Sequence, residues 1–263
     1  MTKSIAIRSV RVIDGTGRTI ERATVVIRGA TIAAVGSDRD LSIPRGATIV
    51  DGRGFTLLPG LIDCHVHLCL GAEPDVVEAI AKETSALTLL KAGQAARATL
   101  EAGFTTVRDV GSRDHAIFTL QQAIDTGLVP GPRIVGAGLA ICMIGGHARF
   151  IGQEVEGAEQ VRSAVRAQIA AGASVIKVIA SGGVLTPGTS PDQAQMTVEE
   201  LQAAVDEAQR AGRKVAAHAH GSSGMKNAVR AGVHSIEHAT LMDEEAAAMM
   251  KRQGVFMVPT LSA

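Results

Sequence analysis

The sequence has 263 residues, of which 46% are apolar and 20% charged, and its 26 Lys and Arg residues balance its 26 Asp and Glu residues. A chain of this length and composition can bury a full core, so disorder is not indicated. The basic residues are scattered and form no positive stripe that would neutralise a phosphate backbone, so nucleic acid is not expected as a partner. With no Trp, no Tyr and five Phe, the chain also offers little surface on which bases or sugars stack.

No segment reaches the roughly 18 uninterrupted apolar residues that a membrane helix needs, so no membrane partner is expected. The first residues show no apolar run behind a basic start, and a cytoplasmic protein is expected. The three cysteines, Cys64, Cys69 and Cys142, are too few for a disulfide framework and are expected to be reduced.

Two kinds of pattern divide the chain. From Ser4 to about Asp51, short β-branched runs lie between turn residues, with a hairpin about Arg28 and Gly29. This predicts that residues 1–55 form a β-strand unit belonging to a small sandwich. After Gly54, Ala-rich helical stretches alternate with short apolar strands, which is typical of an α/β fold with a parallel sheet over residues 56–263.

One joint recurs in the second region, where a helix ends in glycine and a strand follows at once. Glycine is the residue that a left-handed helix C-cap prefers. The joints are at Gly103, Gly172, Gly212, Gly232 and Gly254. The helix before Gly212 is predicted to open on a capping box of Thr197 and Glu200.

Ionisable residues recur five or six positions after these joints, where the strands end: Asp109, Lys177, His218 and His238. In a (β/α) barrel the carboxyl ends of the strands converge on the face that holds the active site, so these residues are expected in one site. The predicted strands are Thr56–Ile62, Phe104–Arg108, Arg133–Ala137, Ser174–Ile179, Lys214–Ala217, His234–Glu237 and Val255–Pro259. They predict a TIM-like (β/α)8 barrel with about seven of its βα units present, because a closed barrel of this type has eight strands.

Histidines follow three of these strands. His65 and His67 have the i, i+2 spacing that points both side chains of a strand to one side, so they can bind one ion together. His218 and His238 are also predicted metal ligands, whereas His220, expected just beyond its strand, is predicted to face the substrate. His234, at a strand start, and His115, in a loop, are predicted to be structural.

Lys177 interrupts the apolar strand Val175–Ile179. A lysine rarely stays buried without a partner, although it can extend its amine to solvent at a barrel end. The functional interpretation is that burial depresses the pKa of the amine, which condenses with carbon dioxide to a carbamate that bridges two metal ions.

Two glycine-containing loops complete the candidate site. Gly145 and Gly146 precede His147 and permit close backbone approach, so His147 is predicted to contact a substrate carboxylate unless the loop is merely flexible. The segment Ser181-Gly182-Gly183 either binds an anion through its amides or simply makes room.

The segments LLPGLIDCHVHL, AAHAHG and SIEHAT, in this order around the apolar strand of Lys177, resemble the amidohydrolase superfamily along the whole chain. More narrowly, the chain resembles the branch that contains imidazolonepropionase-like proteins and bacterial Xaa-Pro and Xaa-Arg dipeptidases. The resemblance implies that His65 and His67 bind one metal, that His218 and His238 bind a second, and that carboxylated Lys177 bridges them. It also implies zinc, and substrate carboxylate contacts from His147 and His220.

Two departures from the family pattern matter. Members of the family continue to an eighth strand with an aspartate that binds metal and takes a proton from the attacking water, and residues 1–263 do not include it. The chain is therefore expected to be a fragment that is inactive alone. The second departure is Ala148, where the branch commonly has glycine.

These features predict a hydrolase with two divalent cations, and zinc is the expected metal. A bridging water would cleave the amide bond of a small-molecule substrate, a dipeptide or an N-acyl amino acid. A cyclic amide, carbamate or ester hydrolase of the same superfamily is one alternative, and a non-catalytic metal-binding fragment is another. A homo-oligomer is compatible with the sequence.

Overall fold

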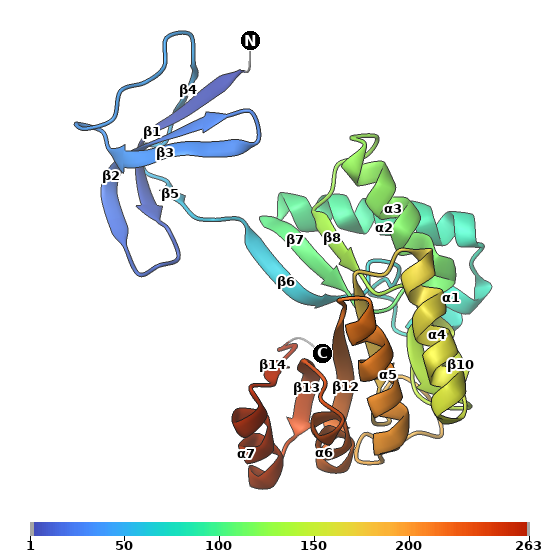
Figure 1. Cartoon of the computed structure of the whole chain (residues 1–263). Coiled ribbons are helices and arrows are strands. Elements are labelled where there is room, and N and C mark those ends of the chain that lie inside the picture. The colour runs from blue at the N-terminus through green and yellow to red at the C-terminus, as the bar shows by residue number, and fades with distance from the viewer. Residues whose placement is uncertain (1–2, 262–263) are drawn as a thin grey trace. The chain divides into compact units, whose positions relative to one another are not determined.

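A computed structural model describes residues 3–261 of the chain. It divides into two compact units, Met1–Gly60 and Leu61–Ala263, which are described separately (Figure 1). Among the described residues, no helix is both long and apolar enough to cross a membrane.

The first unit is a mixed sheet of five strands. These are β1 (Ser4–Ile13), β2 (Thr19–Arg28), β3 (Thr31–Ser37), β4 (Thr48–Asp51) and β5 (Thr56–Leu57). The central strand β1 pairs antiparallel with β2 and parallel with β4 and β5. The hairpin predicted about Arg28 and Gly29 is confirmed, because β2 and β3 pair antiparallel and Gly29 has a φ of 59°.

The second unit is an α/β barrel whose strands run parallel and whose helices lie on the outside (Figure 1). Its strands are β6 (Leu61–Val66), β7 (Phe104–Asp109), β8 (Arg133–Gly136), β9 (Ala140–Met143), β10 (Gly152–Val155), β11 (Val175–Ile179), β12 (Lys214–Gly221), β13 (Ser235–Leu241) and β14 (Phe256–Val258). Its α-helices are α1 (Val76–Lys82), α2 (Ser85–Glu101), α3 (Ala116–Asp125), α4 (Gly157–Ala171), α5 (Val198–Arg210), α6 (Ser222–Arg230) and α7 (Glu244–Gln253). Two 3₁₀ turns cover Arg113–His115 and Arg149–Ile151.

The strands form two hydrogen-bonded runs, β6-β7-β8 and β10-β9-β11-β12-β13-β14. A backbone hydrogen bond of 2.9 Å from Ser174 N to Gly136 O links β8 to the start of β11. The TIM-like barrel class predicted from the sequence is therefore confirmed.

The predicted glycine joints are also confirmed. Their φ angles are all positive: Gly103 97°, Gly172 118°, Gly212 67°, Gly232 85° and Gly254 66°. The capping box is present as well, since the Thr197 side chain accepts from Glu200 N and the Glu200 carboxylate accepts from Thr197 N.

The predicted first barrel strand, Thr56–Ile62, is wrong. Thr56–Leu57 is β5 of the first sheet, and the first barrel strand is Leu61–Val66. Pro59 and Gly60 separate them, because proline has no N–H to donate to a ladder and glycine weakens a strand. The pair β9 and β10 was also not predicted.

Both ends of the barrel sheet are open within the described residues. Strand β6 pairs only with β7, and β14 pairs only with β13. Apolar side chains flank these edges, with Ile62 65% and Phe256 76% exposed.

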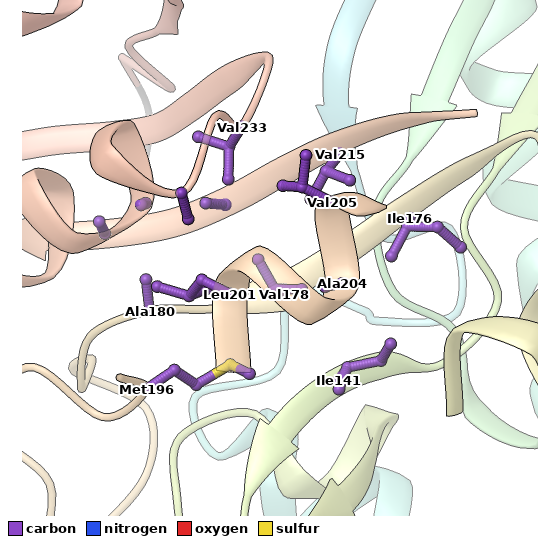
Figure 2. Packing of buried hydrophobic residues seen from close by; sticks show 14 of the residues in the cluster. Ile141, Ile176, Val178, Ala180, Met196, Leu201, Ala204, Val205, Val215 and Val233 are labelled. Carbon is purple, nitrogen blue, oxygen red and sulfur yellow. The ribbon is translucent and has the colours of Figure 1, made fainter. Parts of the chain in front are cut away.

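A large buried apolar cluster lies between the strands and the helices that cover them. Figure 2 shows Leu201 and Val205 of α5 packed in this cluster with Val178 of β11 and Val215 of β12. In α5, Leu201, Ala204, Val205 and Ala208 are buried at the i, i+3, i+4, i+7 spacing of one helix face. This layer fixes the outward face of each strand and so determines which residues point into the barrel.

Candidate metal and active site

One cavity of about 1080 Å³ opens at the carboxyl ends of the barrel strands. The predicted metal-ligating and substrate-binding residues all line it: His65, His67, His147, Lys177, His218, His220 and His238. Asp109, which the sequence also placed in this site, is not among the lining residues. The fold therefore brings together side chains that lie up to 173 positions apart in the chain, from residue 65 to residue 238.

The six imidazoles form one continuous cluster. His65 lies 5.2 Å from His67 and 4.7 Å from His238, measured between ring centroids. His238 lies 4.8 Å from His218 and 4.6 Å from His220, and His218 lies 4.6 Å from His147.

Strand periodicity explains two of these positions. On β12, Val215, Ala217 and Ala219 pack in the outer apolar cluster, so the intervening His218 and His220 point into the barrel. His220 is not beyond its strand, as the sequence predicted, but within it, because β12 continues to Gly221.

On β11, Ile176 and Val178 likewise pack outward, which leaves Lys177 on the inner face. It is 2% exposed.

His238 reaches the cavity through a bulge. Simple alternation would place it on the outer face with Ile236, which packs in the helix-covered cluster. His238 and Ala239 instead have φ angles of 73° and 55°, and the register with β12 shifts after His238. An irregularity of this kind redirects a side chain, and a non-glycine residue tolerates it only where its surroundings hold it.

The partners of three rings dictate which nitrogen carries the proton. His67 Nδ1 lies 2.9 Å from Gly111 O, and His218 Nε2 lies 3.1 Å from Gly182 O. His65 Nδ1 lies 2.9 Å from the Glu237 carboxylate. Each partner can only accept, so each of these nitrogens must donate, and the opposite ring nitrogen carries a lone pair.

Threonine hydroxyls hold the other three rings. Thr260 Oγ1 lies 2.7 Å from His238 Nδ1 and donates to Pro259 O at 2.8 Å, so it accepts from His238 and leaves a lone pair on His238 Nε2. Thr186 Oγ1 accepts from Ala148 N at 3.2 Å and lies 3.0 Å from His147 Nδ1. It is placed to donate to His147, whose Nε2–H then becomes a donor.

His220 Nδ1 lies 2.9 Å from the Thr240 hydroxyl. This hydroxyl suits either tautomer.

Electrostatics keep the cluster neutral. Burial, reinforced by the charge of Lys177, lowers the pKa of His67 to about 4 and that of His238 to about 2. Burial and the neighbouring His220 lower the pKa of His147 to about 4. The pKa values of His65, His218 and His220 also lie below the ordinary value, first because of burial. Neutral imidazoles are the form that binds metal.

The Lys177 side chain is buried beside these neutral imidazoles. Burial lowers its pKa to about 8, partly offset by the charge of Glu237. A buried amine of this kind is available as a nucleophile more often than a surface lysine.

The donor set fits divalent cations. The Nε2 atoms of His65, His67 and His238 and the Nδ1 atom of His218 are unprotonated, and their rings adjoin one cavity. Zinc accepts imidazole nitrogens, and ligands whose other nitrogen is hydrogen-bonded are typical of protein zinc sites. The nitrogens of His218, His220 and His238 also approach within 4.8 Å of one another, so His220 stands near the same position.

Three residues of a buried polar group were given no role by the sequence analysis. Glu237, Arg108 and Ser235 form a hydrogen-bonded group beneath His65. A carboxylate in the middle of the strand Ser235–Leu241, next to the apolar Ile236, was the available signal for Glu237, since carboxylates are rarely buried unless paired.

Asp109, which the sequence placed among the site residues, is fully buried, and burial raises its pKa to about 7. Its carboxyl accepts from Leu68 N at 2.8 Å and from Gly111 N at 3.2 Å, so it joins the loops on either side of His67.

The sequence also led to expectations for His234, His115 and Ala148, which lie outside the predicted set of ligands. His234 Nδ1 accepts from Val215 N at 3.1 Å, and His115 Nε2 contacts Gln168 Oε1 at 2.9 Å, so both have the structural partners expected of them. Ala148 has a φ of 62°, a conformation that glycine adopts at no cost, so glycine would be accommodated at this position.

The chain belongs to the amidohydrolase family, whose model matches residues 56–263. The chain is 34% identical to the ochratoxinase of Aspergillus niger over 284 aligned residues, which cover 95% of this chain and 57% of that protein. It thus spans little more than half the length of this relative. A local match to the imidazolonepropionase of Idiomarina loihiensis has 47% identity over 49 residues, 19% of this chain and 12% of that protein.

Two solved structures are similar along almost the whole chain. A Xaa-Pro dipeptidase with bound methionine has 37% identity and a TM-score of 0.92, covering 99% of this chain and 67% of that one. A prolidase complexed with N-methylphosphonate-L-proline has 38% identity and a TM-score of 0.90, covering 98% of this chain and 66% of that one. The resemblance identified in the sequence is therefore confirmed.

Proposed function

We propose that the protein hydrolyses the amide bond of a dipeptide or an N-acyl amino acid with the help of two divalent cations, and that zinc is the metal. The observation that carries this proposal is the set of fixed tautomers, which leaves unprotonated nitrogens on His65, His67, His218 and His238 beside one cavity. The names of similar proteins agree with it, since one is a Xaa-Pro dipeptidase and another is a prolidase complexed with N-methylphosphonate-L-proline.

In this proposal His65 and His67 hold one cation, and His218 and His238 hold the other. When bound, the cations would lower the pKa of a water molecule and polarise the scissile carbonyl. The Lys177 amine would attack carbon dioxide, form a nitrogen–carbon bond and release a proton to solvent. The resulting carbamate carries two oxygens and a negative charge, so it would link the two cation positions and remove the cost of a buried ammonium.

His147 and His220 would bind the substrate carboxylate. The Thr186 hydroxyl supports this role for His147, because it leaves the outer nitrogen of the ring as a donor. Methionine and proline, the ligand components named for the two similar structures, both carry a carboxylate. His220 is stacked on His238 with ring planes 16° apart, and its tautomer is free to suit a donor role.

The test uses the protein as its gene encodes it, with whatever sequence follows Ala263. A panel of dipeptides and N-acyl amino acids is assayed, each beside its C-terminal amide, with zinc and then with a chelator. We expect chelator-sensitive hydrolysis that favours free carboxylates. Hydrolysis of neutral cyclic amides, carbamates or esters instead would support the other superfamily activities, and metal binding without any turnover would support a non-catalytic role. The cytoplasmic location and an oligomeric state stay predictions.

A further inference from the structure

The carboxylate of Glu237 lies at the centre of a buried polar group beneath the histidine cluster. Glu237 is fully buried. Its Oε2 lies 2.9 Å from His65 Nδ1, and its Oε1 accepts from Arg108 Nη2 at 2.7 Å and from Ser235 Oγ at 2.6 Å. Burying a charged carboxylate without partners costs much free energy, so these three partners are needed to keep Glu237 in this position.

Arg108 connects the same group to the backbone next to His65. Its Nε donates to Cys64 O at 2.6 Å, and its Nη1 donates to Ser235 Oγ at 3.1 Å. The guanidinium is planar and keeps its donors in a fixed arrangement. Arg108 therefore ties the carboxylate of β13 to the residue that precedes His65 on β6.

We propose that Glu237 is a positioning residue that holds His65 with Nδ1 protonated and Nε2 facing the cavity, while Arg108 fixes the carboxylate. This inference deepens the proposed function and rests on it for its purpose, because His65 is one of the proposed metal ligands. Glu237 itself does not line the cavity. It acts through the ring of His65, as partners of metal-binding histidines commonly do.

The first measurement needs no substrate, no metal and no variant of Glu237. Nitrogen NMR of ¹⁵N-histidine-labelled protein reports which nitrogen of each ring carries a proton, and the His65 signal is assigned by its loss in His65→Asn. We expect His65 to be the Nδ1–H tautomer at pH 7. A His65 ring protonated on Nε2 would overturn the proposal even if the protein proves to be an active hydrolase.

The second measurement is zinc affinity by calorimetry in Glu237→Gln. The amide replaces one accepting oxygen with a donor, so it cannot satisfy His65, Arg108 and Ser235 together. We expect zinc to bind about 10- to 100-fold more weakly, with loss of the single His65 tautomer. A loss of less than about tenfold would overturn the proposal.

Two controls separate positioning from general destabilisation. Glu207→Gln breaks another carboxylate–arginine pair. The Glu207 carboxylate on α5 accepts two hydrogen bonds from Arg166 on α4, at 2.7 and 2.9 Å, and neither residue lines the cavity. The melting temperature of this variant should fall, while its zinc affinity stays native. Ser235→Ala removes one donor to Glu237 but leaves His65 and Arg108 in place, and it should keep the His65 tautomer. A matching loss of zinc affinity in Glu207→Gln would overturn the proposal.

Absence of hydrolysis in every assay would refute the proposed function but would leave the tautomer and zinc measurements valid. The two failures are therefore distinguishable.

Discussion

The Thr260 hydroxyl lies 2.7 Å from His238 Nδ1 and is itself committed as a donor to Pro259 O. This single contact leaves the lone pair of His238 on Nε2, the nitrogen that a metal ion would use. The contact matters because His238 stands in a bulged backbone, with a φ of 73°, that turns its side chain toward the cavity.

Thr260→Val should therefore weaken zinc binding by roughly tenfold, since it removes the partner of a proposed ligand. Thr240→Val, which removes the equivalent partner of His220, should leave zinc affinity close to native because His220 is proposed to face the substrate. Calorimetry on both variants measures this. If Thr240→Val instead weakened zinc binding and Thr260→Val did not, His220 would be the metal ligand in place of His238.

Lys177→Ala should abolish the proposed bridge and most of the activity of the gene product. Added short carboxylic acids should restore part of it, because they replace the carbamate oxygens. Lys177→Arg should resist rescue, since a permanently charged guanidinium repels cations and fills the space. Initial rates with and without acetate or propionate test this, and an alanine variant that is fully active without any added acid would refute a bridging role.

His147→Ala should raise KM for substrates with a free carboxylate more than for the corresponding amides. The lost donor would bind that group equally in the ground state and the transition state, so kcat should change less than KM. Steady-state kinetics on matched acid and amide substrates measure the difference. His115→Ala is the control, because His115 pairs with Gln168 outside the cavity lining. Equal KM changes for acids and amides would contradict a carboxylate-binding role.

Residues 1–263 on their own should associate through the barrel edges and show negligible turnover. Strands β6 and β14 each leave one edge unpaired in the described part of the chain, and apolar side chains flank both. Open apolar edges recruit other chains. Light scattering after size exclusion measures the mass, and Ile62→Lys with Phe256→Lys should reduce association. A monodisperse, active monomer would show that the open edges need no further strand.

Much of the barrel was predictable because glycine joints and strand periodicity are local properties. Gly172 and Gly232 mark helix ends by backbone conformation alone, and alternation places Lys177 and His218 on the inner face. His238 also stands at the expected distance after the joint at Gly232. The bulge that turns its side chain inward depends on tertiary packing, however, and left no pattern in the sequence.

Glu237 was missed for a different physical reason. Its role depends on His65 and Arg108, which are 172 and 129 positions away in the chain, and a partner at such a distance has no spacing that a sequence displays. The first barrel strand was misplaced because Leu61–Val66 and the preceding Thr56–Leu57 are both extended and close together in the chain. Only their hydrogen bonding assigns them to different sheets.

The most direct test of the account is the metal content of the gene product after purification in zinc and removal of loosely bound ions. Four histidine nitrogens and one bridging group exceed what a single tetrahedral ion accepts, so the account predicts two zinc ions per chain by elemental analysis. One ion or none in a folded protein would contradict it.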